Sequence, residues 1–123
     1  MNINNKKIVT DAYQRIFGDL DASAVDEYMT KDFVQHNPTI ADGPEGVKQL
    51  LQTLVAKGVQ KQKIQFKHVV AEGDTVILHT SYEMGGHDWR FIDIYRLEND
   101  KLVEHWDAMI QWPETRANNN TMF

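Results

Sequence analysis

The stretch FIDIYRLENDKLVEHWDAMI, residues 91–110, alternates apolar and polar side chains on either side of a short polar interruption. An alternation with a period of two is typical of β-strands, because successive side chains of a strand point to opposite faces of the sheet. The interruption, Glu98-Asn99-Asp100, consists of residues that occur often in turns. The stretch therefore predicts a β-hairpin made of the last two strands of the chain.

The length of the hairpin loop decides which residues share a face of the sheet. A two-residue loop would pair odd residues of one strand with even residues of the other. A three-residue loop over 98–100, with Asp100 in the left-handed conformation that Asp tolerates, would pair odd residues with odd residues. We adopt the three-residue loop. It predicts that one face carries Phe91, Asp93, Tyr95, His105, Asp107 and Met109.

The opposite face of the predicted hairpin carries Ile92, Ile94, Arg96, Glu104, Trp106 and Ala108. On this face Arg96 and Glu104 can form an ion pair across the two strands.

Two carboxylates and a histidine thus lie among aromatic and Met side chains on the first face. Burial raises the pKa of a carboxyl group, and a second carboxylate nearby raises the pKa of one of the two further. Such a group can transfer protons near neutral pH. The pattern is equally compatible with Asp93 and Asp107 facing water, because both faces of the hairpin carry apolar residues.

Helical periodicity fills the first half of the chain. Apolar residues three and four positions apart predict a helix over 3–20 that stops near Gly18. Asp21 can cap a second short helix, which carries Val25, Tyr28 and Met29. A short strand over 32–36 follows and runs into a loop, since Pro38 restricts Asn37 to extended geometry.

A third helix begins at Gly43-Pro44, where Pro occupies the first helical position, and Gly58 suits its C-terminal end. The residues expected on its inner face are Val47, Leu50, Leu51, Leu54 and Val55. From Gln62 onward the period changes to two, with turns at 72–74 and 85–86. Three helices and a short strand followed by four long strands predict an α+β fold.

The composition limits the possible functions. A length of 123 residues predicts one domain, 1–123, and the net charge of −5 argues against nucleic acid as a partner. The chain has no Cys, which excludes disulfides and thiolate zinc sites. No stretch reaches the length of about 20 apolar residues that a membrane span needs. We therefore expect a cytoplasmic protein that binds neither nucleic acid nor membrane.

Five histidines raise the question of a metal site. None of them forms the helical HxxxH spacing of a zinc site, although two histidines and two aspartates could still converge from separate strands. The interpretation that we adopt is a site with no metal and no cofactor.

Two stretches, FVQHNPTIADGPEGV at 33–47 and FIDIYRLENDKLVEHWDAMIQWPE at 91–114, resemble the SnoaL-like polyketide cyclase family of the nuclear transport factor 2-like superfamily. The resemblance covers essentially the whole chain. It implies a cone-shaped fold in which three N-terminal helices pack on a curved, mainly antiparallel sheet that encloses a pocket.

The resemblance also implies roles for individual residues. In the cyclases an aspartate on the last strand is the general acid/base of an aldol ring closure, a role that falls on Asp107. A polar partner, often histidine, lies fourteen residues earlier, where this chain has Asp93. A carboxyl group can stabilise an oxyanion only when it is protonated. His36 and Asn37 match the loop at the pocket mouth, and His79 stands where the family often has histidine.

The resulting hypothesis is a small-molecule enzyme with carboxylate general acid/base chemistry at a carbon next to a carbonyl group, either aldol cyclisation or isomerisation. The expected ligand is a small apolar or polyketide-like molecule. The expected catalytic residues are Asp107, Asp93 and His36. The expected substrate-binding residues are Asn37, His105, Tyr95, Phe91, Met109 and His79.

Two further expectations complete the hypothesis. The alternative function is a non-catalytic module on the same fold that binds a small ligand or a partner. Apolar residues on the outer face of the sheet, among them Ile92, Ile94, Trp106 and Ile110, predict a homodimer packed through that face.

Overall fold

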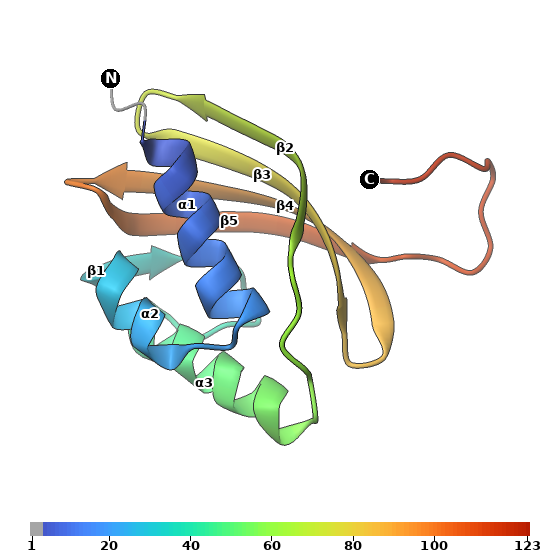
Figure 1. Cartoon of the computed structure of the whole chain (residues 1–123), viewed down its shortest axis with the longest axis horizontal. Coiled ribbons are helices and arrows are strands. Elements are labelled where there is room, and N and C mark those ends of the chain that lie inside the picture. The colour runs from blue at the N-terminus through green and yellow to red at the C-terminus, as the bar shows by residue number, and fades with distance from the viewer. Residues whose placement is uncertain (1–3) are drawn as a thin grey trace.

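The structure, a computed structural model, describes residues 4–123 and is an α+β fold of three helices on a five-stranded sheet (Figure 1). In chain order the elements are α1 (Asn5–Tyr13), the π-helix η1 (Gln14–Gly18), α2 (Ala22–Tyr28), β1 (Met29–Gln35), α3 (Gly43–Ala56), β2 (Gln65–Glu72), β3 (Thr75–Met84), β4 (His87–Glu98) and β5 (Lys101–Gln111). The strand order is β1-β5-β4-β3-β2, with β1 parallel to β5 and all other pairs antiparallel. The helices gather on one side of the sheet (Figure 1), as the predicted cone-shaped architecture requires.

The helical segments begin and end close to the predicted positions. Asp21 caps α2 by accepting a hydrogen bond from the backbone N–H of Ser23, but Met29 already belongs to β1. The first predicted helix, 3–20, is divided into α1 and the π-helical turn η1, and residue 3 lies outside the described residues. Gly58 follows α3 with a φ of 84°, a conformation that glycine adopts at low cost.

One residue of α3 was placed wrongly. Val55, expected on the inner face, is 56% exposed, whereas Val47, Leu51 and Leu54 are buried. Val55 lies eight residues after Val47, which is a rotation of about 80° around the helix, so it sits at the border of the apolar stripe.

In the β4–β5 hairpin the residues that share a face are those predicted, but the loop that joins the strands is shorter than predicted. Asn99 and Asp100 form a two-residue turn with φ of 50° and 64°, and positive φ at both positions is the mark of a type I′ turn. Next to the turn Leu97 pairs with Leu102, but beyond it Arg96 pairs with Glu104, so Val103 is an extra residue in β5. This β-bulge restores the pairing of odd residues with odd residues that we had attributed to a three-residue loop.

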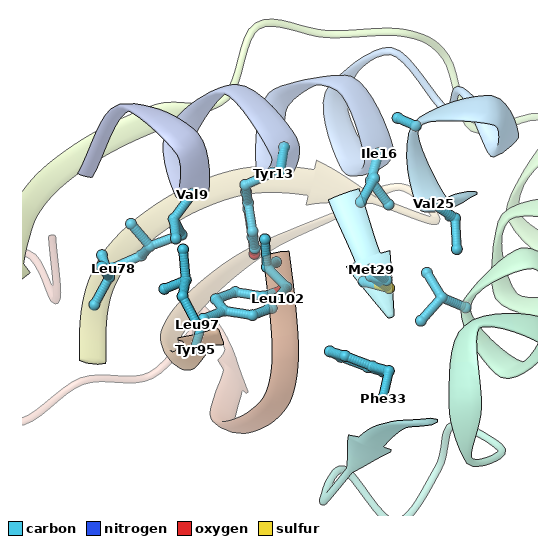
Figure 2. Close-up of a cluster of buried hydrophobic side chains, with 14 of the residues drawn as sticks. Val9, Tyr13, Ile16, Val25, Met29, Phe33, Leu78, Tyr95, Leu97 and Leu102 are labelled. Carbon is cyan, nitrogen blue, oxygen red and sulfur yellow. The ribbon is translucent and has the colours of Figure 1, made fainter. Parts of the chain in front are cut away.

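The core lies between the helices and the inner face of the sheet (Figure 2). Val9 and Tyr13 point from α1 toward side chains of β3, β4 and β5, whereas Ile16 lies on the side of Met29, and Met29 and Phe33 extend the core under α2. A register shift between Phe66 and His68 interrupts the regular alternation of β2.

The outer face of the sheet is apolar and partly open. Ile77, Ile92 and Ile110 on this face are 38, 43 and 46% exposed. Residues 112–123 leave the end of β5 and turn back without regular secondary structure, and Phe123 packs edge-on against His79 (Figure 1). Within the described residues, none of the helices has the length and hydrophobicity of a membrane span.

Candidate functional site

A cavity of about 90 Å³ lies between the helices and the inner face of β3, β4 and β5. Its polar side chains come from α1, the loop after β1, β3 and the two hairpin strands. Its apolar side chains come from η1, the same loop, α3, β3 and the hairpin. The lining residues are Tyr13, Phe17, Asn37, Thr39, Ile40, Leu50, Leu54, Tyr82, Met84, Phe91, Asp93, His105, Asp107 and Met109.

Asp93 and Asp107 are directly opposite each other on β4 and β5. The Asp93 side chain is 3% exposed and that of Asp107 is 9% exposed. Burial raises the pKa of Asp93 above its ordinary value, although the hydrogen bond with His105 opposes this shift. Both carboxyl groups therefore face the cavity, and Asp93 is the more deeply buried.

Asp93 is held by hydrogen bonds from two sides. The Tyr13 hydroxyl donates to Oδ2 of Asp93 at 2.9 Å, and Oδ1 of Asp93 lies 2.8 Å from Nε2 of His105. The Tyr82 hydroxyl lies 3.1 Å from the Tyr13 hydroxyl. Since the Tyr13 proton is directed to Asp93, Tyr82 is the donor of this second bond. Burial raises the pKa of both tyrosines, so both hydroxyls are protonated at neutral pH.

His105 is held through both of its ring nitrogens. The backbone N–H of Asn37 donates to Oε1 of Gln35, which identifies this atom as the oxygen of the Gln35 side-chain amide. The same Oε1 lies 2.7 Å from Nδ1 of His105. Because a carbonyl oxygen only accepts hydrogen bonds, Nδ1 of His105 must carry a proton.

The geometry around His105 leaves two protonation states for the Asp93–His105 pair. In one, His105 is a cation and Asp93 a carboxylate; in the other, His105 is neutral and Asp93 is protonated. One proton lies between Oδ1 and Nε2 in both states, and the pair has no net charge. In the second state Asp93 is the protonated member of the expected pair of carboxyl groups, and in the first state the proton lies on His105 instead.

Asn37 contacts Asp107 through a fixed side-chain amide. Oδ1 of Asn37 accepts hydrogen bonds from the backbone N–H and the hydroxyl of Thr39, so Nδ2 must face the other way. Nδ2 donates to Oδ2 of Asp107 at 2.9 Å. Nε2 of His105 is also nearest to this oxygen, at 3.9 Å. Oδ1 of Asp107 takes part in neither of these contacts.

Three of the expected site residues lie elsewhere. His36 is on the outer face, where it stacks on Trp106 and its Nε2 lies 2.7 Å from Oε2 of Glu104. His79 is also on the outer face, with its Nε2 2.7 Å from the carbonyl oxygen of Met122. Tyr95 is 2% exposed and stacks behind His105, and it does not line the cavity.

The reason for the error at His36 is the alternation of β1. Gln35 and His36 are neighbours at the end of this strand, so their side chains point to opposite faces, and Gln35 is the one that turns inward. Asn37, Phe91, Asp93, His105, Asp107 and Met109 do line the cavity, as expected.

A family profile described as a SnoaL-like domain matches residues 9–105. The chain belongs to the SnoaL-like family. The match includes Tyr13, Gln35, Asn37, Asp93 and His105, and it ends just before Asp107.

Solved structures of SnoaL-like and related proteins have the same fold. TsrD from Streptomyces laurentii matches with a TM-score of 0.73 at 17% identity, covering 89% of this chain and 90% of TsrD. A candidate polyketide cyclase from Acidithiobacillus ferrooxidans gives a TM-score of 0.70 at 18% identity, covering 89% and 91%. An NTF2-like protein of unknown function from Cytophaga hutchinsonii gives 0.69 at 15% identity, covering 89% and 93%. A search of curated proteins gave no match.

Sequence reasoning missed four polar residues of this SnoaL-like site, Tyr13, Gln35, Thr39 and Tyr82. In the sequence, Tyr13 fits the apolar stripe of a helix, and Tyr82 fits the alternation of a strand. Their only signal is a hydroxyl group at a core position, since a buried Tyr usually finds a hydrogen-bond partner. Gln35 could have been found from the alternation of β1 once one residue of that strand was placed.

Asp93, His105 and Asp107 each bring one potential ligand atom to within 4.8 Å of the others. A histidine binds a metal ion through an unprotonated ring nitrogen. Nδ1 of His105 carries a proton directed at Gln35, and Nε2 is engaged by the carboxyl group of Asp93. The arrangement fits a hydrogen-bond network better than a metal centre.

Proposed function

We propose that this SnoaL-like protein catalyses proton transfer at a carbon next to a carbonyl group of a small uncharged molecule, with Asp107 as the general base. One observation supports the proposal most: Asp107 faces an apolar cavity beside Asp93, whose carboxyl group is hydrogen-bonded to His105. The proton shared by Asp93 and His105 leaves this pair without net charge, so no uncompensated negative charge lies next to Asp107.

In the proposed step, Oδ1 of Asp107 removes a proton from the carbon next to the carbonyl group. The electrons of the broken C–H bond form a C=C bond, and the carbonyl oxygen becomes an enolate. Asp107 can return the proton at another carbon, which is an isomerisation. Alternatively, the enolate carbon attacks a second carbonyl group of the same molecule, and the new alkoxide takes up the proton that Asp107 had removed, which is an aldol cyclisation and leaves Asp107 as a carboxylate again.

Tyr82 is the candidate donor to the carbonyl oxygen. Its side chain lines the cavity, and its hydroxyl proton is directed at the Tyr13 hydroxyl. A rotation of the Tyr82 O–H bond would direct this proton at a bound carbonyl oxygen, and the oxygen gains negative charge as the enolate forms.

The charge of the lining indicates which molecules fit. The lining residues among 4–123 include Asp107 but neither Lys nor Arg. Carboxylates and phosphates would therefore be repelled, whereas a neutral carbonyl compound can place its apolar part against Leu50, Leu54 and Phe91. The proposed substrate class is small neutral ketones, with polyketide-like fragments among them.

The test is hydrogen–deuterium exchange at the carbon next to the carbonyl group, followed by NMR in D₂O over a panel of small neutral ketones and diketones. Asp107→Asn should keep the fold and reduce catalysed exchange by about 10²-fold or more. The control is His36→Gln, which changes a polar residue of the outer face and should leave the exchange rate unaltered. Full exchange activity in Asp107→Asn would refute the role of Asp107.

The volume of the cavity favours a second candidate, a non-catalytic binding module. Ligand pockets usually have volumes of about 300 Å³ or more, which is several times the present 90 Å³. A molecule larger than a few heavy atoms must therefore displace flexible wall residues such as Met84 and Met109. Saturable binding of ketones without catalysed exchange would support this second function.

A further inference from the structure

We propose that Gln35 is a positioning residue that holds the shared proton on the Asp93–His105 pair, so that this pair adds no net charge beside Asp107. The inference rests on the proposed function for its catalytic meaning. The hydrogen bonds that carry it do not depend on that function.

The Asp93–His105 pair has a third conceivable protonation state. If the pair lost its shared proton, His105 would be neutral and Asp93 ionised. The remaining ring proton of His105 would lie on Nε2, where it is donated to Asp93. If Nε2 were unprotonated, its lone pair would be directed at the negatively charged carboxylate. Nδ1 would then direct its lone pair at Oε1 of Gln35, only 2.7 Å away. Two acceptors at this distance repel each other, so Gln35 disfavours this state.

Gln35 cannot relieve the repulsion by turning its side-chain amide. A rotation of the amide would direct the NH₂ group at Nδ1 of His105, but it would also direct a donor at the backbone N–H of Asn37. Asn37 is buried, with an exposed fraction of 6%, so its N–H would lose its acceptor in a place with little access to water. The backbone N–H of Asn37 therefore fixes the orientation of the Gln35 side-chain amide. The oxygen of this amide in turn favours a proton on Nδ1 of His105.

Other ionisable groups surround the pair on every side. Tyr13 comes from α1, Tyr82 from β3, Tyr95 from β4 and Asp107 from β5. The three tyrosines have raised pKa values and stay neutral, so Asp107 is the charge that the pair meets. Loss of the shared proton would leave Asp93 with an uncompensated negative charge directly opposite Asp107. This charge would repel the negative charge of the Asp107 carboxylate.

The experiment compares the His105 ring in the parent protein and in Gln35→Met by ¹⁵N NMR of ¹⁵N-histidine-labelled protein, between about pH 5 and about pH 9. Met has a similar length but provides no oxygen acceptor. In the parent, Nδ1 of His105 should stay protonated over the whole range. In Gln35→Met, the Nδ1 proton should be lost as the pH rises, and the proton on Nε2 should remain.

Two variants serve as controls. Gln35→Glu keeps an acceptor oxygen at this position, so Nδ1 of His105 should stay protonated over the whole range. Gln111→Met removes the side-chain amide next to Nδ1 of the exposed His87 and should leave His105 unchanged. Identical His105 signals in the parent and in Gln35→Met, or an unprotonated Nδ1 in the parent, would overturn the inference.

The exchange assay separates this inference from the proposed function. If both hold, Gln35→Met should lose catalysed exchange at high pH first. If no ketone is exchanged by the parent, the proposed function fails, but the NMR result still decides the role of Gln35.

Discussion

At the scale of single residues, the difference between Asp93 and Asp107 explains how two opposite carboxyl groups can have different roles. Asp93 contacts Tyr13 and His105 and is almost completely buried. Asp107 is held at one oxygen by Asn37 and faces the cavity. We infer that Asp93 shapes the electrostatics of the site and that Asp107 is the group that meets a ligand.

The raised pKa of Asp93 predicts a specific effect of pH on stability. The unfolded chain releases this proton near pH 3.8, and the native state releases it at a higher pH. Between these values folding takes up a proton, so the contribution of Asp93 to the free energy of unfolding falls as the pH rises. Asp93→Asn cannot titrate and should lack this fall.

The measurement is the free energy of unfolding in urea, compared between the parent and Asp93→Asn from about pH 4 to about pH 7. The comparison must be made as a difference, because Glu27 and Glu104 have lowered pKa values and their contributions rise with pH. The stability of Asp93→Asn relative to the parent should therefore increase with pH. A difference that is constant over this range would contradict the prediction.

At the scale of elements, the β4–β5 hairpin controls the site through a single extra residue. The type I′ turn at Asn99-Asp100 alone would pair odd residues with even residues, and the bulge at Val103 corrects the register. Leu102 and Val103 are both buried, which a regular strand with one buried face would not allow.

Deletion of Val103 tests whether this residue is the extra one. With Leu97 opposite Leu102 and Arg96 opposite Glu104, removal of Val103 leaves a regular hairpin that keeps His105 and Asp107 on the inner face. We expect unchanged NMR signals of His105 and a loss of stability from the missing buried side chain, measured by thermal denaturation. Val103→Ala keeps the bulge and should lose less stability. Displaced His105 signals in the deletion variant would contradict the assignment of Val103 as the extra residue.

At the scale of the whole molecule, we propose a homodimer through the outer face of the sheet, where Ile77, Ile92 and Ile110 are exposed. The prediction is that Ile92→Lys weakens association, because a charge in an apolar interface loses its hydration. Val55→Lys is the matched control, since Val55 is equally apolar and 56% exposed but lies on α3. Sedimentation at micromolar concentration measures both. A monomeric parent, or equal effects of the two substitutions, would contradict the proposal.

Local sequence patterns were sufficient for the elements and for one face of the hairpin. Asp21 as a helix cap, Gly58 after the third helix and the change of period near Gln62 depend only on neighbouring residues. The shared face of Asp93, His105 and Asp107 was also predicted correctly, although the loop assigned to it was wrong. The bulge at Val103 could not be foreseen, because two adjacent apolar residues do not reveal which of them is extra.

The sequence by itself determined the α+β order of elements, the family resemblance and the proximity of Asp93 to Asp107, since each depends on residues close in the chain or on strands joined by a short turn. Only the tertiary structure decided which face of the sheet is inside, that Gln35 rather than His36 turns toward the site, and that Tyr13 reaches Asp93 over 80 positions. The physical reason is that dihedral preferences and side-chain periodicity act over a few residues. Contacts across the cavity depend instead on how the helices pack over the sheet, which is a property of the whole chain.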